Sequence, residues 1–156
     1  LKKNKIKECY IATSNIDHRK SILMKMKKNG IKVSTFVHKS VKISKFSKNN
    51  LGVGSIIFPN SYIGHNVLIG ECVIIQSNCS IDHHNHVDDF CNLAPRVTTG
   101  GFTKIKKFCE IGISVTIINR VTIQENNLIG AGSLVLKNTK KNSVYYGVPA
   151  KFIRAN

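Results

Sequence analysis

An aliphatic residue recurs at every sixth position from Leu51 to Val135, with one exception. The positions are Leu51, Ile57, Ile63, Ile69, Ile75, Ile81, Val87, Leu93, Thr99, Ile105, Ile111, Ile117, Ile123, Ile129 and Val135, of which only Thr99 is not aliphatic. Neither a helix, with its period of about 3.6 residues, nor a flat strand, with its period of about 2, requires this spacing. A β-solenoid does, because each six-residue segment forms one side of a coil and sends one branched side chain inward.

The fourth residue after each of these positions is restricted to small or short side chains. These residues are Ser55, Ser61, Val67, Val73, Cys79, Asn85, Cys91, Val97, Thr103, Cys109, Val115, Val121, Asn127, Ser133 and Thr139. We expect them at tight corners between the sides of a coil. Glycine often follows the aliphatic residue, at Gly64, Gly70, Gly112 and Gly130, and we expect it there to adopt a turn conformation that other residues avoid.

Three six-residue segments that close a triangle make an 18-residue coil, so the run contains about five coils. Because no insertion breaks the phase, residues 18 positions apart should stack on neighbouring coils. We therefore predict a mainly β chain. A parallel β-helix occupies residues 45–139, a separate unit precedes it at 1–44, and a C-terminal tail follows at 140–156.

The segment before the repeat has the pattern of a single βαβ unit. Residues 6–13 and 31–38 indicate strands, and residues 18–29 indicate a helix with one apolar face. Ser14, Asn15 and Asp17 are candidate N-caps, and Gly30 is a candidate C-cap. The unit resembles the last portion of a small Rossmann-like domain. Its first strand and Gly-rich turn are missing and the chain starts at Leu1, so we expect a fragment or a truncated N-terminus.

The charge and cysteine content restrict the partners and the compartment. The chain has 24 Lys and Arg against 8 Asp and Glu, but its lysines come with many asparagines and do not alternate with aromatic residues, so we expect no nucleic-acid partner. Five cysteines without a CxxC pair, mostly on the repeat, indicate buried free thiols in a reducing compartment. With no long apolar run and no signal peptide, we predict a cytoplasmic protein and no membrane partner.

The six-residue segment 81–86 contains side chains that the repeat does not require. Three histidines and three acids lie close together along the chain: Asp82, His83, His84, His86, Asp88 and Asp89. Histidine suits proton transfer near neutral pH, so this cluster is the candidate for chemistry. Because a solenoid face has no cleft of its own, we expect the cluster to face a neighbouring subunit.

Four stretches carry a resemblance to a known family: NGIKVSTFVHKSVKIS at 29–44, SIDHHNHVDDFCNLAP at 80–95, TTGG at 98–101 and GVPAK at 147–151. They resemble the hexapeptide-repeat sugar acetyltransferases of the bacillosamine-pathway N-acetyltransferase and sialic acid O-acetyltransferase type. The resemblance implies a left-handed β-helix, acetyl-CoA as co-substrate, no metal, and a homotrimer with active sites between subunits. It also implies that residues 1–44 are the remnant of a domain that binds a nucleotide sugar.

The same resemblance implies catalytic roles for two adjacent histidines. His83 matches the family's general base, and His84 stands where the family has the acid that raises the basicity of that histidine. Asp82, Asp88 and Asp89 are candidates to replace the acid. The base would take a proton from an amine or hydroxyl as that group attacks the acetyl thioester, without a covalent enzyme intermediate.

Further positions match those that contact the cofactor and the acceptor. The cofactor positions are Asn92, Gly101, Ile113 and Ala131, and the substrate positions are Ser14 and Asn15. Asn92 replaces a family histidine at the acetyl end of acetyl-CoA. Gly101 matches the glycine whose amide points at the thioester carbonyl, and it lies one full coil after His83. The family lays the pantetheine arm along the other two cofactor positions.

The acceptor stays open between a nucleotide-linked amino sugar and a sialic acid hydroxyl, and the resemblance at residues 6–44 favours an amino sugar of bacterial surface-glycan biosynthesis. Two other classes are alternatives. A non-enzymatic or inactive β-helix binding protein would explain the departures at His84 and Asn92. A γ-class carbonic anhydrase shares the fold, but it needs a His-x4-His pair and histidines on successive coils, and no histidine follows His86.

Overall fold

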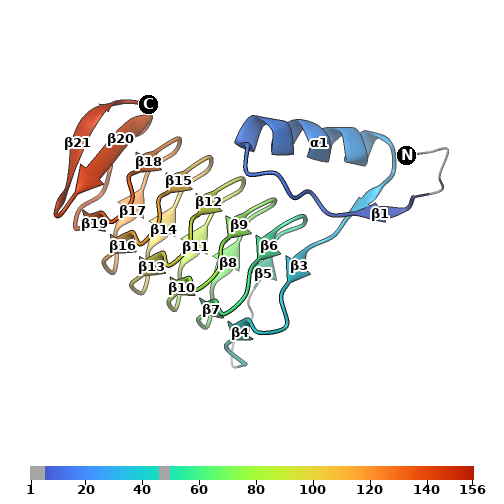
Figure 1. Ribbon diagram of the computed structural model, residues 1–156, viewed down its shortest axis with the longest axis horizontal. Helices are drawn as coiled ribbons and strands as arrows, with labels where there is room; N and C mark the ends of the chain where they lie inside the picture. Colours follow the sequence, from blue (N-terminus) through green and yellow to red (C-terminus); the bar gives the residue numbers. More distant parts are fainter. Residues whose placement is uncertain (1–5, 46–49) are drawn as a thin grey trace.

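The computed structural model describes residues 6–45 and 50–156. The chain forms a parallel β-helix built from three sheets, with helix α1 (Ile16–Lys28) beside its first coils (Figure 1). Strand β1 (Glu8–Cys9) and the C-terminal hairpin lie at opposite ends of the long axis. The mainly β, parallel β-helical fold predicted from the six-residue period is therefore confirmed.

Each face of the β-helix is one sheet of parallel two-residue strands, and the third sheet also includes the longer strands of the C-terminal hairpin. The first face contains β4 (Lys42–Ile43), β7 (Tyr62–Ile63), β10 (Ser80–Ile81), β13 (Thr98–Thr99), β16 (Thr116–Ile117) and β19 (Leu134–Val135). The second face contains β5 (Asn50–Leu51), β8 (Leu68–Ile69), β11 (His86–Val87), β14 (Lys104–Ile105) and β17 (Thr122–Ile123). The third face contains β3 (Phe36–Val37), β6 (Ile56–Ile57), β9 (Ile74–Ile75), β12 (Asn92–Leu93), β15 (Glu110–Ile111), β18 (Leu128–Ile129), β20 (Ser143–Gly147) and β21 (Ala150–Ala155).

The aliphatic residues of the six-residue period form the core. Those from Ile57 to Val135 are buried, most of them completely, and Thr99 is buried among them. Burial of such a side chain stabilises the folded state by about 1.5–3 kcal/mol. The small residues at the fourth position are buried as well, and the hydroxyl of Ser55 donates across its corner to the Gly70 carbonyl at 2.8 Å. Both periodic positions thus have the role that the sequence predicted.

The corners between faces contain a residue with positive φ at every sixth position from Gly54 to Gly132. The residues between these two glycines are not glycine and include Cys72, His84 and Phe90. A left-handed conformation is uncommon for such residues and persists where the surrounding structure imposes it. In this β-helix, the neighbouring coils repeat the same corner and thereby hold each of these residues in the left-handed conformation.

The glycines that follow the aliphatic residues were expected to supply this conformation, and that expectation is wrong. Gly64, Gly70 and Gly112 lie two positions before the positive-φ residue and do not share its φ. Their small size has another reason: a Cβ at Gly64 would lie 2.7 Å from the backbone nitrogen of His83. Glycine is needed at these positions because the next coil passes close to the backbone.

The parallel pairing between coils begins before residue 45, where the repeat was predicted to start. β3 pairs with β6 and β4 with β7, but the offset between these partners, such as Phe36 and Ile56, exceeds one predicted coil by two positions. Ile81 and Thr99, by contrast, are paired one predicted coil apart. The six-residue period therefore did not predict this first coil, which is two residues longer than the predicted coil. The predicted strand 31–38 is also divided, because β2 (Lys32–Val33) pairs with β1 and β3 belongs to the β-helix.

The C-terminal segment 140–156 extends the third face. β20 pairs in parallel with β18, and β21 turns back to pair with β20 in the antiparallel sense. Gly147 has a φ of +111° at the turn between the two strands. The hairpin covers the last coil, so this segment is part of the sheet.

β1, α1 and β2 form the βαβ unit that the sequence predicted at the N-terminus. β1 and β2 are parallel, and α1 begins after Asn15, whose side chain accepts a hydrogen bond from the His18 amide at 2.8 Å. Gly30, with a φ of +64°, follows the C-cap Asn29. In the described part of the chain, no helix has the length and apolar character needed to cross a membrane.

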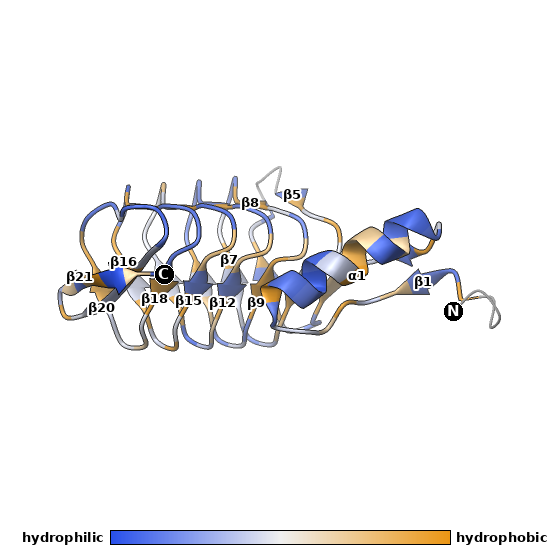
Figure 2. Cartoon of the chain, turned by 90° about the horizontal axis from the view of Figure 1, so that it is seen from above, coloured by the Kyte–Doolittle hydropathy of each residue, from blue (hydrophilic) through white to orange (hydrophobic). Residues whose placement is uncertain are grey.

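Helix α1 is docked on the corner that contains Cys72 and Phe90. Leu23 and Met26 are buried against these residues. Figure 2 shows α1 running alongside the coils with many hydrophilic residues on the visible side. The guanidinium of Arg19, which is 0% exposed, crosses this junction and donates to the carbonyl oxygens of Cys72 and Phe90 at 2.9 and 3.2 Å.

Candidate active site

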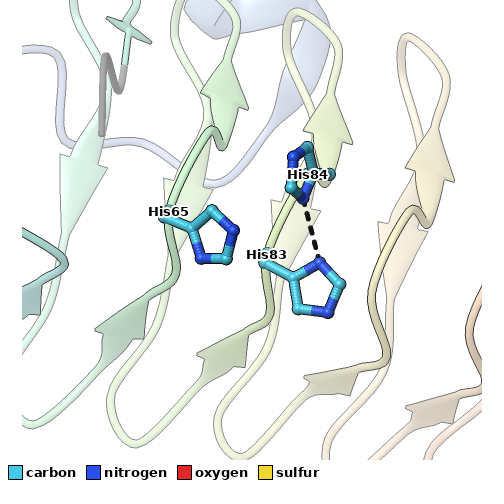
Figure 3. Close-up of side chains that lie close together, drawn as sticks. All are labelled: His65, His83 and His84. Carbon is cyan, nitrogen blue, oxygen red and sulfur yellow. Dashed lines mark hydrogen bonds between the residues drawn. The ribbon is translucent and has the colours of Figure 1, made fainter. Parts of the chain in front are cut away.

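His83 and His84 meet at the corner that follows the first face. Their Nδ1 atoms are 3.0 Å apart, so one ring donates a proton to the other (Figure 3). His65, on the preceding coil, stacks on His83 with ring centroids 5.2 Å apart. The ring of Phe102 stacks on His84 at 4.7 Å and thereby limits the rotation of that ring. The structure thus brings the two predicted catalytic histidines together and adds His65, which stands one coil before His83.

A buried polar network beneath these histidines fixes the turn. Thr99, the only interruption of the aliphatic period, accepts hydrogen bonds through Oγ1 from the Asp82 amide at 3.2 Å and from the Asn85 side chain at 2.5 Å. Asn85 in turn accepts from the Thr103 amide at 2.5 Å. These bonds satisfy buried groups that would otherwise be costly. Thr99, which interrupts the aliphatic period, and the six-residue segment 81–86 are therefore joined by hydrogen bonds into one structural unit.

None of the three candidate acids takes the place of the family's acid beside His83. Asp82 accepts from the backbone amide of His83 at 2.7 Å, and Asp88 pairs with His86 at 3.1 Å on the second face. Asp89 pairs with Lys107 at 2.9 Å. Within residues 6–45 and 50–156, no carboxylate bonds to the His83 ring, whose partner is the imidazole of His84. His86 is likewise separate from the other two histidines of the hexad.

Gly101 lies against the ring of His83, as the stacking of successive coils predicted. A Cβ on Gly101 would be 2.6 Å from Nε2 of His83 and closer still to Cε1, so a larger residue cannot occupy this position without moving the ring. The Gly101 carbonyl accepts from the Arg120 amide at 3.0 Å, and in the described part of the chain its own amide donates to no acceptor. An uncommitted amide beside a histidine is what an oxyanion requires.

A groove of 660 Å³ begins at His83, whereas His65 and His84 are not part of its lining. Its lining includes Asp82, His83, Gly101, Phe102 and Asn119, with strands of the first face as its floor. The groove is open and carries polar groups, which suits a hydrophilic ligand.

A second groove of 380 Å³ runs along the third face and contains the predicted cofactor positions other than Gly101. Asn92, Ile113 and Ala131 line it, together with Pro95 and with Ser14 from the N-terminal unit. Ile113 is 48% exposed, although it is a large apolar residue. The lining is largely aliphatic and suits an apolar chain with a few amides.

Asn92 is held in one orientation by the N-terminal unit. Its Oδ1 accepts from Nη2 of Arg19 at 2.7 Å, and its Nδ2 donates to the Ser14 carbonyl at 2.7 Å. Arg19 also donates to the Thr13 carbonyl at 2.7 Å. Asn92 therefore presents its amide nitrogen on the side of Ser14. Asn15, the other predicted substrate position, caps α1 and is exposed.

The two grooves lie at different corners of the β-helix. His83, His84 and Gly101 follow the first face, whereas Asn92, Ile113 and Ala131 lie on and after the third face. One chain therefore does not bring the predicted base and the predicted pantetheine positions into a single pocket.

Three buried cysteines, Cys72, Cys79 and Cys91, are unsuited to nucleophilic catalysis. Burial raises the pKa of Cys72 and of Cys79 to about 11, and burial also raises the pKa of Cys91 well above its usual value. A thiol must ionise to react, so these side chains stay protonated at neutral pH.

No family model matches the chain. The acyl-[acyl-carrier-protein]–UDP-N-acetylglucosamine O-acyltransferase of Pseudomonas savastanoi is 27% identical over 123 residues, which are 79% of this chain and 40% of that protein. Serine acetyltransferase 2 of Arabidopsis thaliana is 35% identical over 99 residues, 58% of this chain and 27% of that protein. The chain thus spans about two fifths of the length of the first of these relatives.

Solved structures are similar over nearly the whole chain. A mutant of perosamine N-acetyltransferase from Caulobacter crescentus, in complex with CoA and GDP-perosamine, has a TM-score of 0.94 at 22% identity over 99% of this chain and 72% of that one. The acetyltransferase domain of PglB from Neisseria gonorrhoeae has a TM-score of 0.88 at 22% identity over 92% and 69%. This likeness defines the class of fold, a left-handed β-helix shared with sugar acetyltransferases, in agreement with the prediction from sequence.

Proposed function

We propose that the chain is part of an acetyltransferase that moves the acetyl group of acetyl-CoA onto the amino group of a nucleotide-linked sugar. The two grooves support the two binding sites that this reaction needs, one for the sugar and one for acetyl-CoA. The polar groove around His83 suits the acceptor, and the aliphatic groove along Ile113 suits the pantetheine arm. The structural relatives add support, since one of them is in complex with CoA and GDP-perosamine.

In the proposed reaction His83 acts as general base through Nε2. When its Nδ1 donates to Nδ1 of His84, the Nε2 lone pair is free to take the proton of the acceptor amine. The amine attacks the thioester carbonyl, the C–S bond breaks, and CoA leaves as a thiol. This tautomer has a proton on His84 Nε2, which lies 3.2 Å from Nδ2 of Asn66, so it requires the Asn66 amide to be turned until its oxygen accepts that proton.

The Gly101 amide is the proposed donor to the tetrahedral oxyanion. It lies beside the base and has no other acceptor in the described residues. Removal of one such donor typically costs about 10²–10³ in rate. The observation that carries the proposal is a histidine held by a second imidazole beside a glycine whose amide donates to no acceptor in the described residues.

The position of the two grooves leads us to propose a homotrimer in which each site combines two copies. His83 and Gly101 of one copy would face the Asn92, Ile113 and Ala131 groove of the next. A cyclic trimer repeats one such interface three times and closes. The exposed Ile113 and Ile118 would be covered by this contact. Acetyl-CoA is then a co-substrate held between copies, in the cytoplasm.

Residues 1–44 are proposed to contribute to the side of the site that binds the acetyl acceptor. Ser14 lines the aliphatic groove and its carbonyl accepts a hydrogen bond from Asn92, which supports a position of the N-terminal unit beside the proposed acyl group. GDP-perosamine is a ligand of the Caulobacter crescentus protein. The assay below determines which nucleotide and which sugar this chain uses.

The test is release of CoA from acetyl-CoA in the presence of UDP-, dTDP- and GDP-linked amino sugars and of sialic acid. We expect turnover with an amino sugar, and a loss of about 10²–10⁴ in His83→Asn. His86→Asn is the matched control, because His86 belongs to the same hexad but pairs with Asp88 on another face. A chain that neither binds nor consumes acetyl-CoA would overturn the proposal, and turnover with sialic acid alone would replace the amino sugar as acceptor.

A further inference from the structure

Three imidazoles gather at the histidine corner, although the proposed transfer uses only two of them. His65, His83 and His84 each offer a ring nitrogen, and these three atoms lie within 4.8 Å of one another. Across residues 6–45 and 50–156 this is the one such group of potential metal ligands. All three side chains are at least partly exposed, so a dissolved ion can reach them.

The chemistry of this group matches a borderline divalent cation. Three neutral imidazoles with an open fourth position form a known ligand set for Zn²⁺, with Zn–N distances of about 2.0–2.1 Å. Tetrahedral geometry at these distances separates two nitrogens by about 3.3–3.4 Å. The Nδ1 atoms of His83 and His84 are already 3.0 Å apart. His65 belongs to the preceding coil and can complete the set by rotation of its side chain (Figure 3).

We propose that His65, His83 and His84 bind Zn²⁺ and that the bound ion inhibits the transfer reaction. A metal ion on both Nδ1 atoms displaces the proton that the two rings share, and each neutral ring then carries its proton on Nε2. With a proton on Nε2, His83 no longer has the lone pair that the base requires. Inhibition rests on the proposed function, whereas binding of the ion does not.

A substitution of His65 distinguishes metal binding from acetyl transfer, because His65 belongs to the metal group but has no role in the proposed transfer. Its ring stacks on His83 at 5.2 Å without a hydrogen bond to it, and His65→Asn removes one ligand while it keeps a polar residue. The matched control is His86→Asn, which removes a histidine of the same hexad outside the metal group.

The binding experiment uses the untagged full chain after removal of metal by a chelator. Co²⁺ is added while its visible absorption is recorded, and Zn²⁺ is then titrated in competition with a fluorescent chelator. We expect one ion per chain, a tetrahedral Co²⁺ spectrum, and an affinity at least about tenfold lower in His65→Asn but unchanged in His86→Asn. No binding, equal binding by His65→Asn and wild type, or a thiolate-to-cobalt charge-transfer band would overturn the metal site.

The inhibition experiment measures CoA release with increasing free Zn²⁺. We expect wild-type activity to fall with the same midpoint as the binding curve, and the His65→Asn midpoint to shift to at least about tenfold higher Zn²⁺. Inhibition of both proteins at the same concentration would contradict the mechanism. Absence of transfer activity without Zn²⁺ would refute the proposed function and with it the inhibition, whereas the binding experiment would still decide the metal site.

Discussion

Substitution of Arg19 by Met should release helix α1 from the β-helix while the coils stay folded. The guanidinium is completely buried and has no carboxylate partner in the described residues, and burial accordingly lowers the pKa of Arg19. It donates to the carbonyl oxygens of Cys72 and Phe90 and to the side chain of Asn92. Methionine replaces only the aliphatic part of the arginine side chain and has no donor, so these acceptors would stay buried without partners.

The size of the effect follows from two of these acceptors. The carbonyls of Cys72 and Phe90 accept no other hydrogen bond in the described residues. A buried acceptor without a donor costs about 1–3 kcal/mol, so two cost about 2–6 kcal/mol, partly offset because a charge is no longer buried. Taking about 2 kcal/mol as the net loss, the equilibrium for undocking of α1 shifts about thirtyfold.

Hydrogen exchange followed by mass spectrometry measures this equilibrium. Peptides that cover Ile16–Lys28 should exchange about thirtyfold faster in Arg19→Met, while peptides that cover 104–135 should not change. Lys25→Met is the control, because Lys25 is an exposed residue of the same helix. Unchanged exchange in α1, or equal acceleration throughout the β-helix, would refute the view that Arg19 holds the two parts together.

Three other experiments probe the site and the thiols. Gly101→Ala should lose acetyl transfer by about 10² or more with little change in the melting temperature, because its Cβ would displace the His83 ring, whose Nε2 lies 2.6 Å from the Cβ position; full activity would refute the assigned contact. His84→Glu should retain acetyl transfer, because the glutamate can accept the hydrogen bond from His83 Nδ1. His84→Leu, which cannot accept it, should lower kcat/KM at least about tenfold, and kcat/KM of both variants is measured as a function of pH. At pH 8, a chromogenic disulfide should titrate only Cys9 of the five thiols in the native protein, because the other four are buried and out of reach of the reagent, and reaction of several thiols before unfolding would contradict this.

The residues that repeat along the chain were predictable, because each coil obeys the same physical constraint. The inward residues, the small corner residues, the stacking of Gly101 on His83, and the shared groove of Ile113 and Ala131 all follow from counting by 6 and by 18. Thr99 also broke the pattern visibly, next to the hexad that it supports. The residue at positive φ was not predictable, because the corner imposes that conformation on Cys72 or His84 as readily as on glycine.

Contacts between segments that are distant along the chain could not be predicted from the sequence. Nothing in the helix pattern distinguished Arg19 from the neighbouring basic residues, and its burial depends on a corner far along the chain, at Cys72. His65 did have a signal, its place one coil before His83, but a lone histidine in a turn is usually solvated. The choice of His84 as the partner of His83, rather than one of three nearby acids, was decided by side-chain direction at a corner with positive φ.

Acetyl transfer is proposed to take place between copies of this chain, and assemblies that mix two inactive variants test this proposal. His83→Asn lacks the base, and Ala131→Trp fills the aliphatic groove, so each protein alone should be inactive. Unfolded and refolded together in equal amounts, they should recover about one quarter of wild-type CoA release, because that fraction of sites joins an intact His83 to an intact groove on the next copy. A mixture that forms trimers but stays inactive would contradict the account.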